Sequence, residues 1–492
     1  MYSSTKTIEI NGLTSSIIDI EANIFNGMFA FSIVGLKQSK SKETKEKIIS
    51  CLKNLNMRLP NKRIVVNFSK NKAFVNEDYY DLPILISLLK SLKVVKEVGE
   101  MVFAGQINLN GDLIPLVNPY RIIKEAMDKG VKNLIIPYDE NIFNFEKDGM
   151  KIYYAKNIYE VLDFLNHGIS VSHIKSYNFN SDSSNITSIS INDIVGQKAL
   201  IRALIISLVG RHHILVSGVS GAGKSISIEA IKSILPECSN PEKLYINAFN
   251  QDSSNQFLYK PLILKSLPNI KLKDFIGNAK HLGLIVKSAK SFLYMDEINT
   301  YSKAIIDNLR IPMENREIDY QDNEETIYAN CDFTLIASMN PCPCGNLGSD
   351  INKCTCTLAQ IGRYQDKVNK PLEDRFHLKI RVEPVNLQKD TKSEYDLEDI
   401  SKNIKRAWNL QKNRYNNVVG MYNGRLTKNE VDEYIKIDSS LLVLIDDLIH
   451  FYNLSMRIRS NIIAVARSIA DYENSKEIQE KHIYEAFNYQ KF

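Results

Sequence analysis

The first third of the chain alternates short apolar runs with helical patterns. Runs such as FAFSIVGL, KRIVVNF and NLIIPY have the length and β-branched content of strands, and KETKEKIISCLKNLN between the first two has helical character. This alternation predicts a compact α/β domain over residues 1–170.

A second α/β region and a helical end follow. Residues 171–190 are rich in Ser and Asn, which is typical of a linker. Strand-like apolar runs return over residues 191–385, whereas residues 386–492 carry apolar positions at helical spacing, as in SSLLVLIDDLIHFYN and SNIIAVARSIADYEN. The predicted fold class is α/β: an N-terminal α/β domain, a central α/β domain and a C-terminal helical domain.

Composition limits the class of protein but names no activity. The 492 residues are 44% hydrophobic and 24% charged, as in an ordinary soluble protein, and the net charge of +5 is too mild to identify a nucleic-acid binder. No segment approaches the roughly 18 uninterrupted apolar residues of a membrane span, and MYSSTKTIEI lacks the pattern of a signal peptide. We expect a cytoplasmic protein with no membrane partner.

The strongest motif is a phosphate-binding loop. HHILVSGVSGAGKSISIEAIKSIL places G-x-x-x-x-G-K-S between an apolar strand and an amphipathic helix, flanks that a chance glycine-rich turn would lack. The glycines let backbone N–H groups point at phosphates, and the helix adds its positive N-terminus. Lys224 would neutralise phosphate oxygens, and Ser225 would ligate Mg²⁺. The residues predicted to bind ATP are Gly218, Val219, Ser220, Gly221, Ala222, Gly223, Lys224 and Ser225.

Two later strands end in polar residues suited to the same site. SFLYMDEIN ends with Asp296, which would hold the Mg²⁺ hydration shell, and Glu297, which would polarise the attacking water. DFTLIASMN delivers Asn340, a sensor 1 residue, to the sheet edge where the γ-phosphate lies. Each is alone also typical of a solvated strand end or turn. Behind a phosphate loop, together they predict an ATPase.

From these residues onward the chain resembles the magnesium-chelatase-like AAA+ ATPases of the YifB/ComM family. The matching strings are NDIVGQKALIRAL, MDEIN, SMNPCPCG followed by CTC and GRY, KPLEDRFHL, and SMRIRSNIIAVARSIADYENSKEI. AFSIVGL, LPNKRIVVNFSK and FAGQINLNGDLIPL are similar to that family's first domain, which implies a Lon-protease-like, ribosomal-protein-S5-like fold. NEDYYDLPILIS offers no serine where a Lon-type nucleophile is expected, and Ser87 further on suits helix packing.

The resemblance implies a homohexameric ring with ATP sites at subunit boundaries. Arg375 in LEDRF would be the arginine finger that stabilises charge at a neighbour's γ-phosphate; a surface arginine paired with Asp374 or Glu373 is the alternative. Arg457 matches the sensor 2 arginine that contacts nucleotide, with Arg459 close enough to be confused with it.

The chain departs from the family in two places. Val219 and Ser220 replace the usual Pro-Pro of the phosphate loop, and an Arg-Pro-Phe-Arg-Ala-Pro-His-His stretch is absent between the phosphate loop and Asp296. Since backbone amides bind the phosphates, the first change is expected to leave phosphate binding intact.

Four of the seven cysteines form C-x-C, nine residues, C-x-C. Four thiolates on one loop suit a structural Zn²⁺, although C-x-C is tighter than the common C-x₂-C knuckle. Reduced thiols without metal, or a redox role, are the alternatives. The candidate zinc ligands are Cys342, Cys344, Cys354 and Cys356.

Two classes of substrate remain open. As the resemblance implies, the motor would be a helicase or translocase on single-stranded or branched DNA, and the lysines between residues 253 and 290 would suit phosphates, although they are also typical of a solvated face. The alternative is a chelatase-like or chaperone-like motor that remodels a protein, since the hairpin expected in ENREIDYQDNEETIYAN is acidic.

Overall fold

The computed structural model describes residues 1–69, 78–96, 99–140, 142, 145, 149–168, 189–250, 256–278, 280–322, 325–349, 352–384, 394–416, 418 and 420–490. The chain divides into two compact units, residues 1–180 with 247–258, and residues 181–246 with 259–492. The predicted linker, 171–190, lies outside the described residues except for its last two positions. The other predicted domain boundaries stay predictions.

The first unit is built on a mixed sheet. Its described residues form seven strands in the order β3-β4-β2-β1-β5-β8-β9. β1 pairs with β2 in antiparallel fashion, whereas β5, β8 and β9 extend the sheet from β1 as parallel neighbours. The strands are β1 (Tyr2–Asn11), β2 (Thr14–Phe25), β3 (Ala30–Val34), β4 (Arg63–Phe68), β5 (Val102–Phe103), β8 (Asn133–Pro137) and β9 (Lys151–Ala155), with β6 (Gln106–Ile107) and β7 (Leu113–Ile114) as a separate ribbon.

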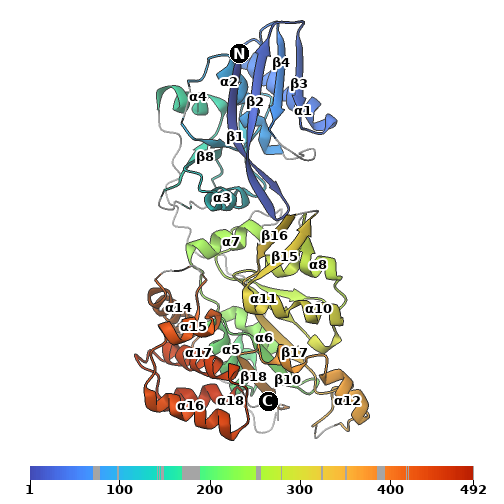
Figure 1. Ribbon diagram of the computed structural model, residues 1–492, viewed down its shortest axis with the longest axis vertical. Coiled ribbons are helices and arrows are strands. Elements are labelled where there is room, and N and C mark those ends of the chain that lie inside the picture. The colour runs from blue at the N-terminus through green and yellow to red at the C-terminus, as the bar shows by residue number, and fades with distance from the viewer. Residues whose placement is uncertain are drawn as a thin grey trace. The chain divides into compact units, whose positions relative to one another are not determined.

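Helices cover this sheet: α1 (Gln38–Asn54), α2 (Asp81–Ser91), α3 (Pro119–Asp128) and α4 (Ile158–His167). α2 packs on β1 and β2 (Figure 1), so its apolar sequence DLPILISLLKS is almost wholly buried. Ser87 lies in this helix with its hydroxyl donating to the carbonyl of Ile84 at 2.9 Å, which is the packing role expected for it.

The second unit holds a parallel sheet of five strands among its described residues, ordered β11-β14-β17-β10-β18. β10, β14 and β17 are buried along their whole length, which explains why most of their residues are apolar. The strands are β11 (Ile263–Ser266), β14 (Phe292–Met295), β17 (Thr334–Met339), β10 (Ile214–Gly218) and β18 (Leu378–Val382). Because β14, β17 and β10 are neighbours, the residues at their carboxyl ends meet at one edge.

Short helices and hairpins connect these strands. The antiparallel pair of β15 (Glu317–Asp322) and β16 (Glu325–Asn330) confirms the hairpin expected before the Asn340 strand. The remaining elements are α5 (Lys198–Gly210), α6 (Lys224–Ala230), α7 (Asn240–Asn250), α8 (Leu272–Ile276), β12 (Gly277–Asn278), β13 (His281–Leu282), α9 (Leu284–Lys287), α10 (Lys303–Asn308), α11 (Arg310–Asn315), α12 (Leu358–Gln365) and α13 (Lys370–Glu373).

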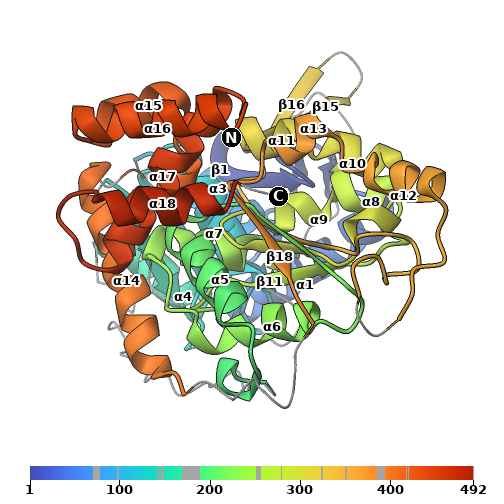
Figure 2. The ribbon, with the colours of Figure 1, turned by 90° about the horizontal axis from the view of Figure 1, so that it is seen from below.

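The end of the chain is helical, as predicted: α14 (Leu397–Arg414), α15 (Lys428–Tyr434), α16 (Ser439–Phe451), α17 (Arg457–Tyr472) and α18 (Glu480–Asn488). α15, α16 and α18 all pack on α17 (Figure 2), and α14 and α17 both contact α5 of the core. Within the described ranges, no helix combines the length and apolarity needed to cross a bilayer. The fold is therefore α/β with a helical C-terminus.

Candidate nucleotide site and cysteine cluster

The phosphate loop runs from the end of β10 into α6. Gly221 and Gly223 have φ angles of +80° and +84°, which side chains rarely adopt, so the loop needs glycine at both positions. Lys224 opens α6, and its ammonium donates to the carbonyls of Gly218 at 2.6 Å and Val219 at 2.9 Å. The lysine therefore lies back across the loop at the place where phosphate oxygens would be bound.

Asp296 lies at the end of β14, beside this loop. Ser225 Oγ is 3.2 and 3.3 Å from the two carboxylate oxygens of Asp296, so a hydroxyl and a carboxylate converge as a Mg²⁺ site requires. Asp296 also accepts a 2.6 Å bond from Ser338 Oγ and pairs with Lys265 Nζ at 3.1 Å. Burial raises the pKa of Asp296, but these partners outweigh burial and the net pKa is lowered. The carboxylate is thus held ionised, ready for a cation.

Glu297 and Asn340 form the adjoining part of the site. Asn340 Nδ2 donates to Glu297 Oε1 at 2.9 Å, and Asn340 Oδ1 accepts from Lys224 Nζ at 3.0 Å. The backbone N–H of Glu297 donates to Ser338 Oγ at 2.9 Å, and Glu297 has a φ of +50°. One amide side chain therefore links the lysine of the phosphate loop to the predicted water-activating carboxylate.

Electrostatics at Lys224 follow from its surroundings. The side chain is 7% exposed, and burial lowers its pKa while Glu297 and Asp296 partly counteract that effect. In this chain the ammonium is compensated by carbonyls and nearby carboxylates. The oxygens of a phosphate chain would replace these partners of the Lys224 ammonium at the same place. The residues present therefore fit a bound nucleoside triphosphate with Mg²⁺.

Arg375 lies away from this constellation. Its guanidinium bonds to the carbonyls of Arg310 and Pro371 and pairs with the carboxylate of Glu314 at 2.5 Å. Arg375 also borders a cavity of about 320 Å³ whose wall includes Arg425 of the helical end. In the part of the chain that is described, all of its partners lie outside the nucleotide site of its own subunit.

For Arg457, the predicted sensor 2 arginine, the structure describes only the backbone. Arg457 opens α17, but its side chain lies outside the described residues. Arg459, its alternative, pairs with Asp446 at 2.8 Å, an ion pair on the helical domain itself. The assignment of Arg457 stays a prediction.

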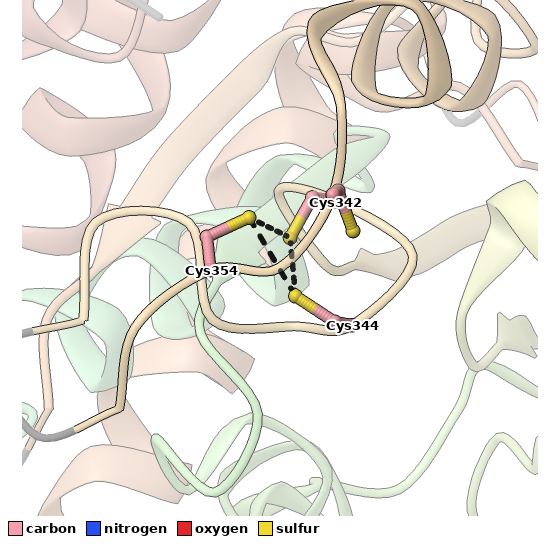
Figure 3. Close-up of side chains that lie close together, drawn as sticks. Cys342, Cys344 and Cys354 are labelled. Carbon is pink, nitrogen blue, oxygen red and sulfur yellow. Dashed lines mark hydrogen bonds between the residues drawn. The ribbon is translucent and has the colours of Figure 1, made fainter.

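The four cysteines gather at one point of the loop between β17 and α12. All four Sγ atoms lie within 4.8 Å of one another. The separations drawn in Figure 3 are 3.4 Å between Cys342 and Cys344, and 3.6 Å from each of these to Cys354. The structure thus brings together cysteines that are up to fourteen positions apart in the chain, which the spacing alone did not require.

Three residues of the candidate nucleotide site were not predicted from the sequence. Ser338 lies on β17, two positions before Asn340, which directly follows the strand, and the two-residue period of extended backbone places both on one face. Gln197 donates to the carbonyls of Ala222 in the phosphate loop and of Glu383 after β18. Lys265, counted only as part of a basic stretch, pairs with Asp296; nothing in the local sequence signals that long-range contact.

A five-stranded parallel sheet with a phosphate loop on one strand and an acidic pair on another defines a P-loop ATPase of the AAA+ class. Three family models match successive parts of the chain: "Subunit ChlI of Mg-chelatase" over residues 20–140, "Magnesium chelatase, subunit ChlI" over 190–390, and "Magnesium chelatase, subunit ChlI C-terminal" over 395–490. The chain belongs to the magnesium-chelatase-like AAA+ ATPase family that includes ComM and YifB.

Similar proteins match along almost the whole length. The competence protein ComM of Haemophilus influenzae and the YifB protein of Escherichia coli are each 26% identical, over 97% of this chain and 95% of theirs. The magnesium-chelatase 38 kDa subunit of Cereibacter sphaeroides is 25% identical over 30% of this chain and 51% of its own length.

Proposed function

We propose that this chain is an ATP-hydrolysing ring motor that works on DNA. The observation that carries the ATPase part is the continuous set of contacts from Lys224 through Asn340 to Glu297, beside the Ser225–Asp296 pair. The loop amides and Lys224 would hold the phosphates, and Ser225 and Asp296 would hold Mg²⁺. When bound, the cation neutralises charge that develops on phosphate oxygens.

Within this site the chain's own residues divide the work of hydrolysis. Glu297 orients and polarises a water molecule, since its carboxylate is fixed by Asn340 on one side and its backbone by Ser338 on the other. Asn340 also touches Lys224, so a change at the phosphates reaches the catalytic carboxylate through a single side chain.

Arg375 is the arginine finger in this proposal and acts on a neighbouring subunit. Support comes from its position beside a cavity, with partners that belong to no part of its own nucleotide site. The Glu314 carboxylate holds the guanidinium until a more highly charged phosphate competes for it. A finger that acts on a neighbouring subunit requires an assembly of identical subunits, such as a ring. The expected number of six comes from the resemblance to the AAA+ family.

DNA as the substrate is supported by the lysines that remain unpaired in the segment before β14. Lys290 forms a buried pair with Asp332 at 2.6 Å, and Lys265 pairs with Asp296, so neither is available to a phosphate backbone. The exposed members are Lys260, Lys271, Lys273 and Lys280. The similarity to ComM, whose name assigns it to competence, agrees with a DNA substrate for this chain.

A protein substrate is the second candidate, favoured by the hairpin of β15 and β16. This hairpin carries Glu317 and Asp319, and Tyr328 on it is 70% exposed. Acidic groups repel a phosphate backbone, whereas an exposed tyrosine flanked by acids suits a peptide surface.

One experiment separates the two candidates. ATP turnover is measured with and without single-stranded and forked DNA, at low and high salt, for the natural chain and for K271E/K273E/K280E. We expect DNA to stimulate turnover and the triple variant to lose that stimulation. When the binding constant for single-stranded DNA is plotted against salt concentration on logarithmic axes, the slope should be shallower by about 2 for the triple variant. The matched control is K405E/K412E/K436E, three exposed lysines of the helical end. Turnover that no DNA changes at low salt would favour a protein substrate.

Zinc is the metal that we propose for the four cysteines. In a tetrahedral site with Zn–S bonds of about 2.3 Å, the sulfur atoms stand about 3.8 Å apart. The separations of 3.4 and 3.6 Å are close to that edge and far from the roughly 2.05 Å of a disulfide. Because all four ligands come from the protein, the site would be structural rather than catalytic.

A further inference from the structure

The cysteine loop contacts the phosphate loop directly. The backbone N–H of Ser220 donates to the carbonyl of Gly345 at 3.1 Å. Gly345 has a φ of +77°, and a Cβ atom there would lie 2.9 Å from Cβ of Ser220. The two loops therefore touch backbone to backbone at a position where only glycine fits.

This contact lies inside the cysteine cluster. Gly345 follows Cys344 directly, and its N–H closes a turn onto the carbonyl of Cys342 at 3.0 Å. The N–H of Leu347 donates to Cys342 Sγ at 3.3 Å, as backbone amides do around metal-bound sulfur. An interaction that fixes the sulfur atoms therefore also fixes the carbonyl of Gly345, which accepts the N–H of Ser220 in the phosphate loop.

Helix and strand hydrogen bonds do not hold the shape of the described part of the cysteine loop. Its described residues, 341–349 and 352–357, contain no helix or strand, and many of its side chains other than the cysteines are polar. Cys342 is fully buried, whereas Cys344, Cys354 and Cys356 are partly exposed. A segment of this kind keeps a single conformation when a metal cross-links it, and it samples many when the cross-link is missing.

We propose that zinc held by the four cysteines braces the phosphate loop through the Gly345–Ser220 contact, so that zinc occupancy sets the affinity for nucleotide. This rests on the proposed function only in taking the phosphate loop as the ATP site. The N–H of Ser220 is available because residue 220 is not a proline, which would carry no N–H. The metal site thus acts on a loop that it does not itself coordinate.

Two variants of the full chain test the two halves of the proposal. C354S/C356S removes two ligands, so zinc should fall from one ion per chain to none and the Kd for Mg·ATPγS should rise five- to tenfold. G345A keeps all four ligands, so zinc should stay at one ion per chain while the Kd rises by a similar factor. The factor is what losing about one hydrogen bond produces.

The matched control is G348A in the same loop. Gly348 also has a positive φ, +83°, but a Cβ there would meet the end of the Arg381 side chain at 2.9 Å, not the phosphate loop. It carries the same backbone strain and should change neither zinc content nor Kd. Zinc is counted by elemental mass spectrometry, and Kd is measured by equilibrium titration on folded protein checked by circular dichroism.

Three other results would overturn the metal site, the coupling between the two loops, or the ATP site. No zinc on the natural chain purified from zinc-supplemented cells overturns the metal site. Zinc loss with an unchanged Kd, or a G345A variant with the Kd of G348A, overturns the coupling while the ATP site stands. A natural chain that carries zinc but binds no nucleotide overturns the proposed function, and the coupling with it.

Discussion

Ser338 gives the sharpest single-residue prediction, because one hydroxyl positions both acids of the site. It donates to Asp296 Oδ1 at 2.6 Å and accepts the backbone N–H of Glu297 at 2.9 Å, and the residue is fully buried. Ser338→Ala removes both bonds. The charge-assisted bond to the carboxylate contributes about 2 kcal/mol, and the buried N–H left without a partner adds about 1 kcal/mol.

A loss of about 2–3 kcal/mol corresponds to a fall in kcat of roughly 30- to 150-fold, if the loss is expressed in the transition state. Nucleotide binding should persist, because Lys224 and the loop amides do not use Ser338. The assay is steady-state ATP turnover with a Mg²⁺ titration. We expect lower kcat, a raised Mg²⁺ requirement and a nearly unchanged KM for ATP.

The control is Ser288→Ala. Ser288 is equally buried, but its hydroxyl donates only to the carbonyl of Leu284, one turn earlier. If the loss of a buried hydroxyl lowered kcat only by destabilising the fold, kcat would fall in both variants. If Ser338→Ala and Ser288→Ala showed the same kcat and the same Mg²⁺ dependence, the positioning role of Ser338 would be refuted.

The remaining predictions concern the proposed ring and the buried core. Arg375→Ala and Lys224→Ala should each be inactive alone, yet mixing them should restore part of the turnover, because a mixed ring contains sites with an intact finger and an intact loop; no recovery on mixing would argue against action in trans. Burial lowers the pKa of His212 and His213 well below the usual value. Nδ1 of His213 accepts the backbone N–H of Leu335 at 2.8 Å, so the neutral ring carries its proton on Nε2, near the carbonyl of Met313. A second proton on Nδ1 would break the bond from Leu335 and place a charged ring beside the guanidinium of Arg425. The unfolded chain therefore binds more protons below about pH 6.5, and stability should fall as pH drops from 6.5, by up to about 1.4 kcal/mol per pH unit for each histidine; urea unfolding that is unchanged between pH 7 and pH 5 would contradict this.

The elements of the proposed phosphate site were predictable because their signal is local. The glycine spacing, the apolar strand before it and the acids after a later strand all lie within short windows. The neighbouring positions of β10, β14 and β17 then bring Lys224, Asp296 and Asn340 together, as the resemblance to AAA+ proteins led us to expect.

The parts that were not predictable depend on long-range pairing. Lys265 and Lys290 belong to one basic stretch, and only the fold shows that each is paired with a distant aspartate. Likewise residues 247–258 group with the first unit, although they lie in the middle of the ATPase sequence. No local pattern carries that information, because the contacts join residues far apart in the chain.

The contact between the cysteine loop and the phosphate loop has the same origin. The sequence indicated a cluster of thiols and a separate glycine-rich loop, but Ser220 and Gly345 are distant in the chain and neither residue type announces a partner. Because β10 and β17 are parallel neighbours in the sheet, the loops that follow them start side by side.

Single-turnover hydrolysis of ATP in Mg²⁺, measured for the natural chain beside Glu297→Gln, shows whether this site binds and hydrolyses ATP. We predict that both proteins bind ATP with similar Kd, and that the variant loses at least about 100-fold in rate because the oriented carboxylate that polarises water is gone. A natural chain that does not bind ATP would overturn the nucleotide site, and a variant that hydrolyses ATP at the natural rate would overturn the role of Glu297.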